Sequence, residues 1–385
     1  MYDYSSLEIE NIPPDVILNI SGLEFVKGSN KTNEHKPNRQ GNYTQTAQLS
    51  ESLHLVHEYR PRTDKSIFKI KGSLHKHAQR NNNFRNYTLT DFERTVKELC
   101  ETLQINPISL RVRCLEFGVN INPSHSANDL LNSIICYKGN EYEKRTYNGK
   151  GYLKRFVNAQ YDVKIYNKSL QYNLPENILR YEIKVKKMDF VNKKLKHPIN
   201  TINDLLNPEI IAGLINILID SIENLYIYDY RINTKQINSK RDKHTLIECI
   251  NPTFWKPYRE THTPTGYKKK VKRFRELVQK YAPNNLQNEL KILIESRCND
   301  LQTVTQNYHY TENATVTHYY PYIVGNNSKL NPRYCATCGR EITHQKTNSM
   351  FCSEKLYGPN AKQCRNKVSN RKQFEKRFYT GYTLF

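Results

Sequence analysis

The stretch 161–187 constrains the fold most, because its apolar and polar residues alternate twice. From Tyr161 to Asn167, apolar side chains at every second position predict a strand with one buried face. The same alternation returns at 179–186, after a connection rich in Asn and Pro. Two such strands predict an antiparallel hairpin whose polar face carries a tyrosine, a carboxylate and several lysines. A solvated amphipathic hairpin explains the alternation equally well, so function depends on what other strands bring to this face.

Other segments predict further strands and helices around this hairpin. Alternation predicts strands near residues 7–9, at 66–77 and at 108–122, where Gly118 indicates a bulge or a close approach of another group. Helices are predicted from a Thr90–Glu93 capping box, from Ser126 to about Ile135, and from Asn207 and Pro208 to about Tyr226. We interpret residues 28–50 as a loop or a hairpin excursion. This order predicts an α+β fold with a largely antiparallel sheet, helices on one face and the other face open.

The chain of 385 residues divides into four predicted parts. Residues 1–235 form the core with the sheet, and 236–305 form a basic helical extension that carries KKKVKRFRE and includes two helices at 263–301. A Tyr-, Thr- and Asn-rich linker follows at 306–333, and a cysteine module with a basic tail occupies 334–385.

The formal charge of +22 predicts a polyanionic partner, with nucleic acid favoured over an anionic membrane surface. Some of the 28 tyrosines could stack on unpaired bases. The start of the chain is acidic and polar, without the features of a secretory signal. The longest apolar run, 210–219, is too short to span a bilayer. We therefore expect a soluble, cytoplasmic protein without a membrane partner.

The polar sides of the predicted strands carry the residues of a candidate active site: His75, His77, Glu116, Tyr166, Lys168 and Glu182. Histidines and carboxylates can hold a divalent cation that polarises a phosphate, and a tyrosine beside it can attack the phosphorus. Lys168 could lower the pKa of the Tyr166 hydroxyl or stabilise the transition state. The alternative is that the tyrosine packs and the glutamates pair with Lys or Arg. Basic residues expected to contact DNA are Lys69, Lys71, Lys164, Arg180, Lys269, Lys270, Lys272 and Arg273.

Four ordered motifs carry a resemblance to a known family: FKIKGSLHKH, LRVRCLEFGVN, YDVKIYNKS and ILRYEIKVKK. Over roughly residues 60–230 the chain resembles the gene II-type replication initiators of filamentous phages and their plasmid and mobile-element relatives. The resemblance implies an HUH-endonuclease-like fold and rolling-circle DNA replication. Such a nickase cuts one strand at an origin, joins it through a tyrosine and later religates it. Single-stranded origin DNA, Mg²⁺ or Mn²⁺, and a host replication helicase and polymerase are the implied partners.

The resemblance also implies roles for individual residues. Tyr166, in its Tyr-x-Lys context, matches the nucleophile, Lys168 is the implied transition-state stabiliser, and Glu116 and Glu182 match the acidic positions of their strands. The phage pattern has Gly-His-Asn after its first strand, whereas this chain has 80–82 as Arg-Asn-Asn, so the histidine role passes to His75 or His77. Lys76 stands between those histidines where related nickases have an apolar residue. Tyr152 is the competing nucleophile.

Four cysteines near the C-terminus have the spacing of a structural zinc site: Cys335, Cys338, Cys352 and Cys364. Gly339 permits the tight turn of a zinc knuckle, and His344 is a weaker candidate for the fourth ligand. A redox-active cysteine pair is the alternative. The basic segment that follows is expected to touch DNA phosphates. These features leave a second hypothesis for the whole chain, a non-catalytic zinc-containing protein that binds an origin or regulates transcription.

Overall fold

The computed structural model describes residues 2–27, 41–147 and 150–303, without side chains for 27, 144–147, 150–152 and 301–303. The chain divides into two compact units, 1–310 and 311–385. The second unit lies outside the described residues, and so do the predicted linker and zinc module. Among the described residues, no helix has the length and apolarity that crossing a membrane requires.

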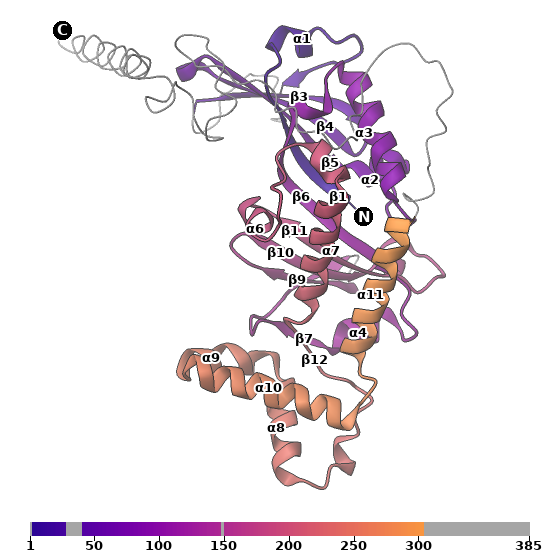
Figure 1. Cartoon of the computed structure of the whole chain (residues 1–385), viewed down its shortest axis with the longest axis vertical. Coiled ribbons are helices and arrows are strands. Elements are labelled where there is room, and N and C mark those ends of the chain that lie inside the picture. The colour runs from indigo at the N-terminus through magenta and orange to yellow at the C-terminus, as the bar shows by residue number, and fades with distance from the viewer. Residues whose placement is uncertain (1, 28–40, 148–149, 304–385) are drawn as a thin grey trace, which may run out of the picture. The chain divides into compact units, whose positions relative to one another are not determined.

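A ten-stranded sheet forms the centre of the first unit, and its paired strands run antiparallel (Figure 1). In spatial order its strands are β2 (Val26–Lys27), β3 (Tyr43–Ser50), β4 (Leu53–Arg60), β5 (Lys65–Ser73), β1 (Tyr2–Ile9), β6 (Leu110–Ile121), β11 (Leu179–Val185), β10 (Tyr161–Asn167), β9 (Lys150–Val157) and β8 (Glu143–Tyr147). A separate two-stranded sheet pairs β7 (Ile134–Tyr137) with β12 (Leu225–Ile227). The predicted α+β class with a largely antiparallel sheet is confirmed.

The predicted hairpin forms with the register that its alternation requires. Lys164 lies opposite Glu182, and Tyr166 lies opposite Arg180. β11 also pairs with β6, which places Lys184 opposite Glu116. The connection contains a short helix, α5 (Lys168–Tyr172), because the Asn167 side chain accepts a hydrogen bond from the Leu170 N–H and caps it. Lys168 therefore begins a helix instead of ending a strand.

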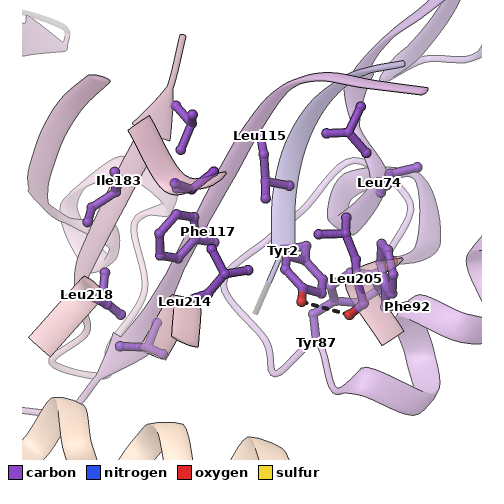
Figure 2. Close-up of a cluster of buried hydrophobic side chains, with 14 of the residues drawn as sticks. Tyr2, Leu74, Tyr87, Phe92, Leu115, Phe117, Ile183, Leu205, Leu214 and Leu218 are labelled. Atoms are coloured by element: carbon purple, nitrogen blue, oxygen red, sulfur yellow. Dashed lines mark hydrogen bonds between the residues drawn. The ribbon is translucent and has the colours of Figure 1, made fainter. Parts of the chain in front are cut away.

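The apolar side chains of the central strands pack against three long helices, α3 (Leu89–Leu103), α7 (Pro208–Ile222) and α11 (Leu286–Thr303). Figure 1 shows α7 and α11 crossing in front of the central strands. In the close-up of Figure 2, Phe117 and Ile183 of the sheet lie beside Leu214 and Leu218 of α7. Burial of these side chains on one face leaves the opposite face of the same strands to the polar residues.

Two helix boundaries differ from the sequence prediction. α3 is capped by Thr88 and Asp91, which exchange hydrogen bonds of 3.1 and 3.0 Å, so the box lies one half-turn before the predicted Thr90 and Glu93. α7 begins at Pro208 after the Asn207 cap, as predicted, but ends at Ile222. It stops there because 225–227 pairs with β7 as a strand.

The helices α8 (Lys240–Ile250), α9 (Trp255–Thr261) and α10 (Pro264–Tyr281) share a second apolar core around Trp255 and Phe274, to which β7 and β12 also contribute. The sequence prediction placed α11 in the same extension, but its buried Leu286, Leu290 and Ile294 belong to the core of the sheet. Apolar periodicity predicted the helix without indicating which core it joins. The remaining short helices are α1 (Pro14–Leu18), α2 (Leu74–Ala78), α4 (Ala127–Ser133) and α6 (Asp189–Asn192).

Gly118 of β6 permits the close approach of β11, one of the two alternatives predicted for it. A Cβ atom at this position would lie 2.6 Å from Cα and 2.5 Å from Cβ of Glu182, which lies opposite Gly118 across the strand pair. Such distances are far inside van der Waals contact. The glycine therefore sets how near Glu182 comes to β6.

We expect Gly118→Ala to lower the free energy of unfolding by about 1–3 kcal/mol, because β11 must shift to admit the methyl group. Urea unfolding followed by circular dichroism measures the change. Gly213→Ala in α7 is the matched control, since its Cβ would meet only the flexible side chain of Leu195. Equal midpoints for Gly118→Ala and the wild type would show that β11 can move away at no cost.

Candidate active site

Six charged side chains form a row of alternating sign across the polar face of the central strands. In order, the charged row is Lys184, Glu116, Lys164, Glu182, Arg180 and Asp3. Neighbouring members are joined by ion pairs of 3.0, 2.9, 3.2, 2.6 and 3.2 Å. The register of β10, β11 and β6 sets Lys164 across from Glu182 and Lys184 across from Glu116. Arg180 extends the row by pairing with Glu182 of its own strand and with Asp3 of β1. Three carboxylates and three cations leave the row close to neutral.

The polar face is covered at one end, whereas the sequence prediction expected it to be open. Asp3, Arg180 and Glu182 are at most 4% exposed. The side chain of Asn83 lies over this end and donates a 2.6 Å hydrogen bond to Asp3. Asn120 of β6 holds the same segment by donating to the carbonyl oxygen of Asn83 at 3.2 Å. Alternation along the strands predicted the polar face correctly. It could not predict that the segment between β5 and α3 covers that face, because alternation reports only on the strands themselves.

Tyr166 is the tyrosine of this face, and it is 8% exposed. Its hydroxyl donates a 3.3 Å hydrogen bond to Oε2 of Glu182. Burial, followed by the negative charge of Glu182, raises the pKa of Tyr166 well above its ordinary value. The pKa of Tyr166 is thus raised on balance, whereas the sequence indicated Lys168 as a group that could lower it. Tyr166 is a neutral phenol whose proton points to a carboxylate that can accept it.

Lys168 is fully buried beside this tyrosine. Its Nζ donates to Oδ1 of Asn83 and lies 5.1 Å from the ring centroid of Tyr166 and 5.0 Å from that of Tyr172. Burial, with the nearby charge of Arg180 as the next cause, lowers the pKa of Lys168 to about 7. This ammonium group can therefore gain or lose its proton near neutral pH, next to the Tyr166 ring.

The two histidines were predicted to lie on a strand, but they lie on the one-turn helix α2. β5 ends at Ser73 because its Oγ accepts a hydrogen bond from the Lys76 N–H and caps that helix. Two residues apart on a helix, His75 and His77 point to different sides. His75 is buried and stacks on Tyr87, and burial lowers its pKa to about 3.

The Nδ1 atom of His77 lies 2.9 Å from Oγ of Ser50, on the side of β3. The four predicted ligands, His75, His77, Glu116 and Glu182, are thus not brought together as one set. Throughout the part of the chain that the structure describes, no group of three or more His, Cys, Asp or Glu side chains could hold a metal ion. The cysteines predicted to bind zinc lie outside the described residues, and so does the side chain of Tyr152.

Residues that the sequence reasoning missed include Asp3, Asn83 and Tyr4. Tyr4 of β1 is half-buried, and its ring centroid lies 4.4 Å from Nζ of Lys184 at the end of the charged row. The register of β1 against β6 shifts between Tyr2 and Ser5, so a simple alternation does not place residues 3 and 4. Asn83 lies in a loop, where no periodic signal exists.

The basic residues predicted to contact DNA fall into two groups. Lys164 and Arg180 form ion pairs with carboxylates of the charged row, and Arg180 is 2% exposed. Other predicted members with carboxylate partners are Lys69 with Glu58, Lys270 with Glu248, Arg273 with Asp242 and, at 3.9 Å, Lys272 with Glu276. Lys71 is partly exposed, and Lys269 and Lys272 of α10 are exposed to solvent. The exposed members have their ammonium groups accessible at the surface.

We predict that Lys168 makes stability depend on pH above neutrality. Its pKa is about 7 in the folded chain against about 10.4 when unfolded, so between these values the unfolded chain binds more protons. The free energy of unfolding then rises with pH, by at most about 1.4 kcal/mol per pH unit for one proton. Lys168→Met should lack this rise in urea titrations at pH 7, 8 and 9. The exposed Lys193→Met should keep it, and an identical slope in Lys168→Met would contradict a neutral buried amine.

Comparison with known proteins finds a weak likeness among solved structures. No family model matches the chain, and no curated protein matches it. The chain is similar to a solved structure of a rolling circle replication initiator protein from Geobacillus stearothermophilus. The match has 12% identity, covers 66% of this chain and 96% of that chain, and has a TM-score of 0.32. Because both identity and TM-score are this low, the function of this chain has to be inferred from its own residues.

Proposed function

We propose that this protein is a rolling-circle replication initiator that nicks and religates one DNA strand through a covalent phosphotyrosine. The contact between the Tyr166 hydroxyl and Glu182 carries the proposal. It joins a nucleophile to a proton acceptor on a face that also holds Lys164, Lys168 and Arg180. The ordered motifs and the charge of +22 support DNA as the substrate.

In the proposed step, the Tyr166 oxygen attacks the phosphorus of a phosphodiester while its proton passes to Glu182. The bond from phosphorus to one sugar oxygen breaks, and that oxygen receives the proton that Glu182 took up and leaves as a free hydroxyl. Attack by such a hydroxyl on the phosphotyrosine reverses the step and rejoins the strand. Because the pKa of Tyr166 is raised, proton transfer has to accompany the attack instead of preceding it. Arg180 supplies positive charge nearby, and Lys168 adds to it below about pH 7, where its amine is protonated.

Several parts of the expected function stay predictions. They include a host helicase and polymerase as partners, Mg²⁺ or Mn²⁺ as a cofactor, and a structural zinc ion at Cys335, Cys338, Cys352 and Cys364. The donor set at Glu116 and Glu182 does not fit a divalent cation as it stands, because lysine and arginine groups contact both carboxylates. The step proposed above therefore uses only side chains of this chain.

A non-catalytic DNA-binding protein is the alternative, and one observation favours it. Each charged member of the row has an oppositely charged partner, and Tyr166 is almost fully buried, as in a purely structural network. The two functions differ in product, because only the enzyme leaves protein covalently attached to DNA. Incubation with labelled single-stranded origin DNA and denaturing electrophoresis distinguish them.

We expect Tyr166→Phe to abolish the covalent adduct and leave DNA affinity nearly unchanged, because only the attacking oxygen is removed. Tyr4→Phe is the matched control, since Tyr4 lies on the same polar face beside Lys184 and should retain adduct formation. Tyr152→Phe tests the other candidate from the sequence. An adduct that survives in Tyr166→Phe and disappears in either of the other variants would reassign the nucleophile.

We expect the exposed lysines of α10 to contribute to DNA affinity. Between residues 231 and 281, fourteen Lys and Arg stand against four acidic residues, and Lys269 and Lys272 are exposed. Removing one phosphate-binding ammonium group, in Lys269→Ala or in Lys272→Ala, should reduce the slope of log affinity against log salt by about 0.7–0.9. Fluorescence anisotropy across salt concentrations measures it. Lys97→Ala, an exposed lysine of α3, is the control, and an equal slope change there would show that α10 has no special part.

A further inference from the structure

One ammonium group lies between the two carboxylates that were predicted to bind a catalytic metal. Nζ of Lys164 is 2.9 Å from Oε1 of Glu116 and 3.2 Å from Oε1 of Glu182. The same oxygen of Glu116 is 3.0 Å from Nζ of Lys184. Oε2 of Glu182 accepts from Nε of Arg180 at 2.6 Å and from the hydroxyl of Tyr166 at 3.3 Å. These contacts place a positive charge where a bridging cation would have to lie.

Without this lysine the donor set would be two carboxylates, and water would have to complete the coordination of Mg²⁺ or Mn²⁺. Hard divalent cations require several oxygen ligands in near-octahedral positions. Among the described residues, Lys164 bridges two acidic groups, Glu116 and Glu182. The third carboxylate of the row, Asp3, is separated from them by Arg180. His75 and His77 supply no nearby nitrogen pair, because they point to different sides of α2. A metal would have to displace an ammonium that is already neutralised by two carboxylates.

The pairing of the strands allows a long side chain on β10 to reach both carboxylates. Lys164 lies directly across from Glu182, while Glu116 lies on β6, on the far side of β11. Gly118 lets β11 approach β6 closely, which brings the two carboxylates within reach of one side chain. Burial lowers the pKa of Lys164, but the charges of Glu182 and Glu116 more than offset this and hold it above the ordinary value. The group therefore stays charged.

We propose that the ammonium group of Lys164 takes the place of a divalent cation between Glu116 and Glu182, so that this carboxylate pair binds neither Mg²⁺ nor Mn²⁺. Lys164 acts as a positioning residue: it holds Glu182 in contact with the Tyr166 hydroxyl and neutralises the pair. The inference rests on the proposed function only for the role of Tyr166 as nucleophile. Its central claim concerns ion binding and can be measured without DNA.

The test is a titration of the full chain with Mn²⁺, in which electron paramagnetic resonance measures the concentration of the free ion. Wild type and Glu116→Gln should bind the same amount of Mn²⁺ up to about 1 mM, because the glutamate pair contributes no site. Lys164→Met removes the charge, keeps the length and leaves two facing carboxylates. It should bind about one additional Mn²⁺ per chain, and the added change Glu116→Gln should abolish that gain. Lys184→Met, which leaves Lys164 in place, should show no gain.

Each outcome decides the inference. Wild-type binding of Mn²⁺ that Glu116→Gln removes would overturn it, and this comparison stands even if Lys164→Met fails to fold. A folded Lys164→Met that gains no ion, or a gain equally present in Lys184→Met, would overturn the role of Lys164. Failure of every variant to form a DNA adduct would instead count against the proposed function, because the ion titration does not depend on catalysis.

Discussion

The charged row depends on the antiparallel register of β10, β11 and β6. A slip of one residue would turn Lys164 and Glu182 to the apolar face and bring their neighbours to the polar one. Taking one member from such a buried network leaves its partner charged and unpaired, which typically costs about 3–5 kcal/mol. The apolar residues of the same strands fix the register from the opposite face, because they must meet α7 and α11. Packing on one face thus aligns the charges on the other.

Burial gives the residues around Tyr166 unusual protonation states. The phenol is held neutral, while Lys168 has its pKa lowered to about 7. Glu182 keeps its charge, since Lys164 and Arg180 outweigh the effect of burial and lower its pKa. The result is a neutral donor pointing at an ionised acceptor in a region poorly accessible to water. In the proposed reaction, this arrangement lets the proton transfer occur only when a phosphate is bound, and it keeps the resting tyrosine unreactive.

Sequence reasoning succeeded where one periodic pattern decides the structure. The pairing of β10 with β11 and the start of α7 at Pro208 follow from local signals, and the close approach at Gly118 is one of the two alternatives that its position indicated. It failed where a single polar side chain changes the backbone. The cap at Ser73 ends β5 and starts the helix that carries the two histidines. The alternation over 66–77, which resembles one strand, therefore spans a strand and a helix. The register shift in β1 and the loop at Asn83 have no periodic signal, so Asp3 and Asn83 could not be placed.

The distribution of charge indicates that binding and chemistry reside on different elements. The charged row is internally balanced and mostly buried, so it offers little net attraction to a polyanion. The excess positive charge lies elsewhere, with the exposed lysines of α10 among its clearest examples. Long-range attraction by such lysines weakens with salt, whereas buried ion pairs are screened much less. If the protein binds DNA as proposed, its affinity can vary with ionic strength while Glu182 stays fixed against Tyr166. The balance of charge in the candidate site also keeps the site rigid. An unpaired charge there would need water or a new partner, and a strand would have to move to provide either.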